Sequence, residues 1–129
     1  RHKMIPSIHT KGAEKTVLGL LKKYNIQKSI IHWYSGPLDL IAEFLEQGCY
    51  FTIGPDILSG SEIYLHLPME RILVETDNPT GMTWISGHKN RGDDIIKVYK
   101  QLSKKIPIEK KLLIELVKEN LIELMNKNL

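Results

Sequence analysis

The sequence has a single cysteine, no long hydrophobic run and little excess charge. Cys49 alone cannot form an internal disulfide, and such sparing use of cysteine fits a reducing cytoplasm. No apolar run approaches the roughly 18 residues that a membrane-spanning helix requires, so we expect no membrane partner. The basic N-terminus lacks the apolar segment and the small-residue cleavage site of a signal peptide.

The charge balance is nearly even, with 18 basic and 15 acidic residues and a net charge of +3. Bulk electrostatics of this size does not by itself imply a nucleic-acid partner. A chain of 129 residues can bury one hydrophobic core. Because it opens on Arg1 and runs almost directly into a strand-like segment, we expect residues 1–129 to be a single domain or a fragment of a longer protein.

Short apolar runs alternate with helical patterns along the whole chain. They predict strands at residues 4–8, 29–32, 49–53 and 71–75, helices at 12–24, 37–47, 93–104 and 108–125, and a short helical turn at 61–67. Residues 78–92, rich in glycine and polar residues, are predicted to form a long loop. The repeated strand–helix order predicts an α/β fold with a parallel sheet. A closed eight-stranded barrel takes about 250 residues, so this chain has room for about four βα units, half of a barrel.

The helical patterns also predict which side chains face the core. The predicted inward sets are Ala13, Val17, Leu20, Leu21 and Tyr24; Leu40, Ile41, Phe44 and Leu45; Ile95, Ile96, Tyr99 and Leu102; and Leu112, Leu113, Leu116, Val117, Leu121 and Leu124. Lysines occupy much of the remaining helical surface.

Ligand-type side chains follow three of the four predicted strands. His9 ends the first strand, His32 the second and Asp77 the fourth. In a parallel α/β barrel the chemistry gathers at the carboxyl ends of the strands, so we expect these three groups to lie at one rim. Two imidazoles and a carboxylate suit a divalent metal ion, which lowers the pKa of bound water, while a neighbouring carboxylate takes up a proton. The alternative for each histidine is a hydrogen-bonded structural role.

Five segments of the sequence match motifs of one known family. The segments "IPSIHTKGAEKTV", "SIIHWYSG", "CYFTIG", "ILVETDNP" and "ENLIELM" resemble successive motifs in the C-terminal half of TatD-type metal-dependent deoxyribonucleases. That family belongs to the amidohydrolase-like (β/α)8 barrels of the TIM type. The resemblance runs from about residue 6 to 125. It implies the C-terminal half of such a barrel, and hydrolysis of DNA phosphodiester bonds by water activated by divalent metal ions: two ions of magnesium, manganese or zinc.

The resemblance also implies roles for individual residues. His9, His32 and Asp77 would be metal ligands, and Asp77 would also orient or deprotonate the attacking water. Glu75 would order these ligands through hydrogen bonds. The residues implied in substrate or phosphate binding are Lys11, Trp33, Ser35 and Arg91. Trp33 and Tyr34 both follow His32, and of the two we expect Tyr34 to be the buried one.

The sequence departs from the family in two ways that limit the implied activity. It has no "HxH" pair among its five histidines, and it lacks the glutamate that a middle strand of the family supplies. This chain would therefore hold only part of the metal site. We expect it to need the missing N-terminal barrel half or another copy of the chain as a partner. The alternatives are a non-catalytic half-barrel in an assembly and an amidohydrolase-type enzyme for a small cyclic amide or ester.

Overall fold

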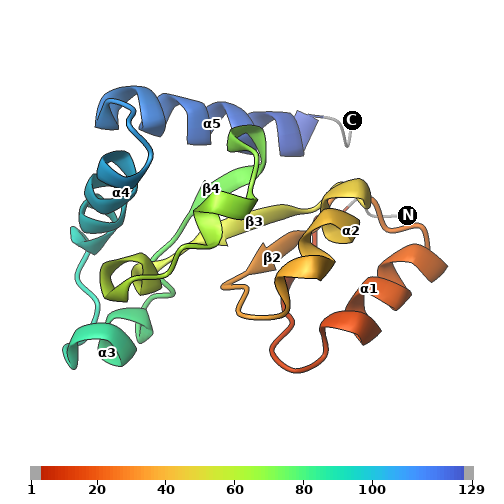
Figure 1. Cartoon of the computed structure of the whole chain (residues 1–129). Helices are drawn as coiled ribbons and strands as arrows, with labels where there is room; N and C mark the ends of the chain where they lie inside the picture. The colour runs from red at the N-terminus through yellow and green to blue at the C-terminus, as the bar shows by residue number, and fades with distance from the viewer. Residues whose placement is uncertain (1–3, 127–129) are drawn as a thin grey trace.

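The structure, a computed structural model, describes residues 4–126 and contains one parallel sheet with helices around it (Figure 1). The strands are β1 (Ser7–His9), β2 (Ile30–His32), β3 (Tyr50–Ile53) and β4 (Ile72–Val74), in the spatial order β1-β2-β3-β4. The helices are α1 (Glu14–Lys23), α2 (Ile41–Glu46), α3 (Gly81–Ser86), α4 (Asp94–Lys105) and α5 (Lys110–Asn126). The predicted α/β class and parallel strand pairing are confirmed.

The strand register brings the ends of β1 and β2 to the same level. Ile8 pairs with Ile31, and His9 pairs with His32. Because all four strands are parallel, their carboxyl ends lie at one edge of the sheet, and the segments that follow β1, β2 and β4 start there. This edge is where the predicted ligand residues sit.

Aromatic and branched side chains fill the core between the sheet and the helices. Phe51 of β3 lies at its centre and is fully buried. The rings of Tyr34 and Phe44 meet it edge-on, at centroid distances of 5.5 and 6.2 Å, a favoured arrangement for aromatic pairs. Tyr34 is 4% exposed, which confirms that it is the buried member of the Trp33–Tyr34 pair. Its hydroxyl donates a hydrogen bond to the carbonyl oxygen of Pro37, and burial raises its pKa to about 12.

The predicted inward faces of several helices are partly wrong. α1 buries Leu18 and Leu21, and α4 buries Asp94, Val98 and Leu102. The exposed side chains that were predicted to face inward are Ala13, Leu20, Tyr24, Ile96, Leu112 and Leu121. These helices are apolar around more than one side, so the pattern of apolar residues alone does not show which side the sheet covers.

Two predicted elements also differ from the structure. The predicted helix at 37–47 is a 3₁₀ turn (Leu38–Leu40) followed by the short helix α2. The predicted loop at 78–92 contains α3. The 3₁₀ turn Ile63–His66 confirms the predicted helical turn, and a further 3₁₀ turn (Pro55–Ser59) follows β3. Across the described residues, every helix is too short or too polar to cross a membrane.

Asn120 attaches α5 to the start of β4. Its side-chain amide donates hydrogen bonds to the carbonyl oxygens of Met69 and Ile72, both at 2.8 Å, and the side chain is 7% exposed. In Figure 1 α5 runs along the top of the molecule beside β4. These two bonds join α5 to the 3₁₀ turn Met69–Arg71 and to the first residue of β4.

We expect Asn120→Ala to lower the free energy of unfolding by about 2–3 kcal/mol. The substitution removes two hydrogen bonds, and the one to Ile72 is buried. Urea unfolding followed by circular dichroism measures the change. Glu119→Ala, on an exposed position of the same helix, is the control and should change stability by less than about 0.5 kcal/mol. Equal stabilities of the two variants would contradict the assigned role of Asn120.

Candidate metal centre

Three ligand-type side chains converge at the carboxyl edge of the sheet. His32 ends β2, and Glu75 and Asp77 follow β4. The His32 Nδ1 atom lies 2.6 Å from the Glu75 carboxylate, and its Nε2 atom lies 3.3 Å from the Asp77 carboxylate. One ligand atom from each of the three residues lies within 4.8 Å of the other two. This is a compact group of one imidazole and two carboxylates.

Hydrogen bonds from β3 hold the Glu75 carboxylate in place. The Thr52 hydroxyl donates to Glu75 and accepts a hydrogen bond from the backbone N–H of Trp33, at 3.0 Å. Burial raises the pKa of Glu75 above its ordinary value, against the opposing effects of the Thr52 hydrogen bond and of His32. When the Nδ1–H group of His32 donates a hydrogen bond to the Glu75 carboxylate, the Nε2 atom keeps a lone pair on the side of Asp77.

The backbone around the centre adopts conformations that most residues avoid. Trp33 and Asp77 have φ values of 44° and 49°, in the left-handed region. Such strained residues cluster at functional sites. Gly81 is required by a close approach of two backbone segments. A β-carbon at Gly81 would lie 2.1 Å from the carbonyl oxygen of Thr76, so the turn that carries Asp77 has no room for a side chain there.

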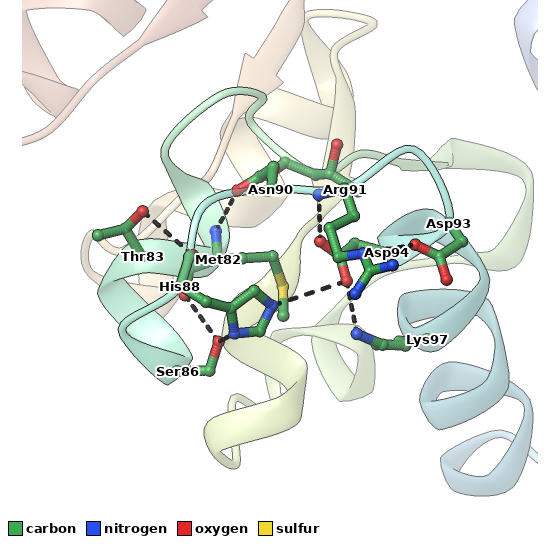
Figure 2. Close-up of polar contacts among 10 residues, drawn as sticks. Met82, Thr83, Ser86, His88, Asn90, Arg91, Asp93, Asp94 and Lys97 are labelled. Carbon is green, nitrogen blue, oxygen red and sulfur yellow. Dashed lines mark hydrogen bonds and ion pairs between the residues drawn. The ribbon is translucent and has the colours of Figure 1, made fainter.

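Asn90, which was not predicted as a functional residue, holds this turn by hydrogen bonds although it lies 14 residues from Thr76 in the sequence. Its side-chain oxygen accepts the N–H of Met82, at 2.7 Å, as Figure 2 shows. Its side-chain nitrogen donates to the carbonyl oxygen of Thr76, also at 2.7 Å. The backbone N–H of Gly81 donates to the carbonyl oxygen of Asp77, at 2.8 Å. The turn and α3 therefore form one hydrogen-bonded unit. A lone asparagine in a polar segment gives no signal of this role in the sequence.

His9 lies beside the group of three, on the neighbouring strand. Its ring centroid is 5.5 Å from that of His32, and the two rings are tilted by 51°. The side chain of His9 is exposed, and it is not part of the tight set formed by His32, Glu75 and Asp77. Its role as a ligand stays a prediction.

A depression with a volume of about 350 Å³ opens beside the centre. The residues that line it are His9, Lys11, Trp33, Ser35, Asp77 and Trp84. The structure thus brings three of the four predicted substrate-binding residues to one place, next to Asp77. Trp84, which was not predicted, falls in the segment 78–92, whose composition predicts a loop.

Arg91, the fourth predicted substrate-binding residue, does not line this depression. Its Nε atom lies 3.8 Å from Asp93, and its backbone N–H donates to the buried Asp94 carboxylate, at 2.6 Å (Figure 2). Lys97 also bonds Asp94, at 2.6 Å. The hydrogen bonds from Lys97 and from the Arg91 backbone lower the pKa of Asp94. The observed contacts of Arg91 therefore belong to the start of α4, and its phosphate contact stays a prediction.

The donor set suits a divalent metal ion. Imidazole nitrogen and carboxylate oxygen are ligands for zinc and manganese, and carboxylates also suit magnesium. Two carboxylates this close repel each other when both are ionised, and a cation between them removes that repulsion. His32 and Asp77 would hold the ion, with Glu75 bonded to the far side of His32 and His9 within reach of the same edge.

Comparison with known proteins gives one family. A sequence model of the family described as "TatD related DNase" matches residues 1–126. The chain is 29% identical over 75 residues to a putative deoxyribonuclease tatdn3-B of Xenopus laevis, which covers 57% of this chain and 29% of that protein. It is 34% identical over 65 residues to an uncharacterized metal-dependent hydrolase of Haemophilus influenzae, which covers 48% of this chain and 26% of that protein.

A solved structure has the same fold. The crystal structure of YJJV, a TatD homolog from Escherichia coli, superimposes with a TM-score of 0.75 at 22% sequence identity. The match covers 88% of this chain and 46% of that one, so the chain spans less than half of its solved relative and less than a third of the two curated relatives above. The predicted fold, half of a TIM-type barrel, is confirmed.

Proposed function

Since the chain belongs to the family of TatD-related DNases, we propose that it supplies part of a metal-dependent site that hydrolyses DNA phosphodiester bonds. The convergence of His32, Glu75 and Asp77 beside an open depression carries the proposal. The depression provides room for a substrate next to the Asp77 carboxylate. The printed names of the relatives, a deoxyribonuclease and a metal-dependent hydrolase, agree with this chemistry.

The side chains of the site divide the chemistry among them. One or two divalent ions, when bound, supply a Lewis acid for the phosphate and lower the pKa of the attacking water. The Asp77 carboxylate lines the depression and accepts a proton from that water. Glu75 fixes the orientation of His32 through Nδ1. Together these groups place a proton acceptor beside the ion-binding atoms.

The remaining predicted residues position the substrate. Lys11 lines the depression and attracts a phosphate group as a point charge. The Ser35 hydroxyl can donate a hydrogen bond to a phosphate oxygen, and the Trp33 ring offers a surface on which a base can stack. We propose Arg91 as a more distant phosphate contact, reached by a longer stretch of DNA.

We propose that the remaining ligands come from a second segment of protein. The sequence has neither the "HxH" pair nor the additional glutamate that the resemblance leads us to expect. An N-terminal barrel half, or another copy of the chain, would lie against the sheet and complete the site. β1 and β4 are both edge strands of the described sheet, so backbone groups are available for pairing on either side.

Metal binding and DNA cleavage test the proposal separately. We expect the chain to bind Mn²⁺ in titration calorimetry, and His32→Ala to weaken this binding by at least about 10- to 100-fold. His66→Ala, at an exposed position outside the group of three, should bind as the wild type does. A labelled single-stranded oligonucleotide should be cleaved with added Mn²⁺ or Mg²⁺, by the chain alone or together with an N-terminal half, and not with EDTA. Equal Mn²⁺ affinity of the wild type and His32→Ala, with no cleavage, would reject the proposal.

A further inference from the structure

Trp84 is a large apolar side chain that the fold leaves uncovered. It is 81% exposed, although an indole normally buries much of its surface. It lies on α3, and it lines the same depression as His9 and Asp77. Because Trp84 borders an open depression together with charged side chains, it is placed to contact a molecule bound there.

The fold holds the helix of Trp84 at a fixed place relative to Asp77. α3 packs against the 3₁₀ turn Pro55–Ser59, and Met82, two residues before Trp84, is 2% exposed. Asn90 joins Met82 to Thr76, and the N–H of Gly81 bonds the carbonyl oxygen of Asp77. The backbone that carries Trp84 is thus tied to the backbone that carries the proposed proton acceptor.

Trp33 offers less free surface than Trp84. Its side chain is half-buried, and its ring meets the His32 ring edge-on at a centroid distance of 6.5 Å. The close approach of Gly54 occupies further space near this ring, since a β-carbon there would lie 3.7 Å from it. Trp84 therefore adds a more open aromatic surface to the depression that Trp33 also lines.

The chemistry around Trp84 identifies its ligand. An aromatic surface beside a cation, Lys11, suits a molecule that joins a planar ring to a phosphate. We propose that Trp84 stacks on a nucleobase of the DNA and so positions the adjoining phosphodiester at Asp77. The proposal rests on the proposed nuclease function and adds a substrate-positioning residue to it. Stacking tolerates any base, because every base has a π-face.

Tryptophan fluorescence gives a test that requires neither metal nor cleavage. The sequence has two tryptophans, so Trp33→Phe leaves Trp84 as the single indole reporter. We expect oligothymidylate, added without metal, to quench this fluorescence in a saturable way. In fluorescence anisotropy with a labelled oligothymidylate, Trp84→Ala should weaken binding by about 5- to 150-fold, which corresponds to the roughly 1–3 kcal/mol of base stacking. Trp84→Phe should restore most of the affinity.

A matched control and a kinetic readout complete the test. Tyr24→Ala removes another exposed aromatic side chain, which is 63% exposed and lies at the end of α1, at the opposite end of the sheet. This variant should bind oligothymidylate with unchanged affinity. In a cleaving preparation, Trp84→Ala should raise KM for DNA and change kcat little. Unchanged affinity in Trp84→Ala would overturn the inference, and cleavage by the same preparation would leave the nuclease proposal standing. Weakened binding by Trp84→Ala, with no DNA cleavage by the chain either alone or together with an N-terminal half, would support the role of Trp84 and reject the nuclease proposal.

Discussion

Asp77→Asn is expected to reduce metal-dependent DNA hydrolysis by at least about 10³-fold. The amide cannot accept the proton of the attacking water, and it is a weaker ligand for a cation than a carboxylate; general-base catalysis alone contributes roughly 10²–10⁴-fold. Asparagine tolerates the left-handed backbone that Asp77 adopts, so the turn should keep its shape. Initial rates on a labelled single-stranded oligonucleotide with added Mn²⁺ measure the effect.

Asp39→Asn is the matched control for this substitution. Asp39 is an exposed carboxylate in the 3₁₀ turn Leu38–Leu40, outside the depression and outside the group of three. Its variant should retain full activity. The urea midpoint of Asp77→Asn should stay close to that of the wild type, which separates loss of chemistry from loss of fold. Retention of more than a tenth of the wild-type rate by Asp77→Asn would show that another group accepts the proton.

Gly81→Ala should damage both stability and activity, although it adds a single methyl group. The new β-carbon would lie 2.1 Å from the Thr76 carbonyl oxygen and 3.0 Å from the β-carbon of Asp77. Atoms cannot approach so closely, so the turn must move, and overpacking of this kind typically costs roughly 1–3 kcal/mol. A displacement of about 1 Å at a catalytic group can lower the rate about 10²-fold. Urea unfolding and initial rates give the two quantities.

Gly92→Ala provides the comparison for Gly81→Ala. A β-carbon at Gly92 meets no atom within 4 Å, and its φ lies outside the left-handed region. The control should change the free energy of unfolding by less than about 0.5 kcal/mol and leave the rate unchanged. If Gly81→Ala behaves as Gly92→Ala does, the turn is more plastic than its packing indicates, and Asp77 is not held by the contact with Gly81.

The sequence was sufficient to locate the four strands because each is a short apolar run, although the first strand lies at Ser7–His9 and not at 4–8. Parallel pairing followed from the helices between the strands, and this in turn placed His32 and Asp77 at one edge before any coordinates were known. The expectation that Tyr34 rather than Trp33 is the buried residue is also confirmed. These features depend on neighbours close in sequence or on a general property of parallel sheets.

Features that depend on residues far apart in the chain could not be predicted from the sequence. α3 begins where Asn90 bonds Met82 and Thr76, and no local pattern reveals a partner that lies 14 residues away. The exposure of Leu20 and Ile96 depends on which side of each helix meets the sheet. The short contact between Glu75 and His32 depends on Thr52, a residue of the intervening strand. In each case the deciding interaction joins separate elements.

The left-handed backbone conformation of Trp33 lowers the free energy of unfolding of this protein. A bulky residue in that conformation costs of order 1–3 kcal/mol, and glycine would recover much of it. Glycine would also delete an aromatic wall of the depression beside Asp77. Thermostability engineering that optimises the fold alone would choose this substitution and lose a wall of the pocket, a local instance of the trade-off between rigidity and activity.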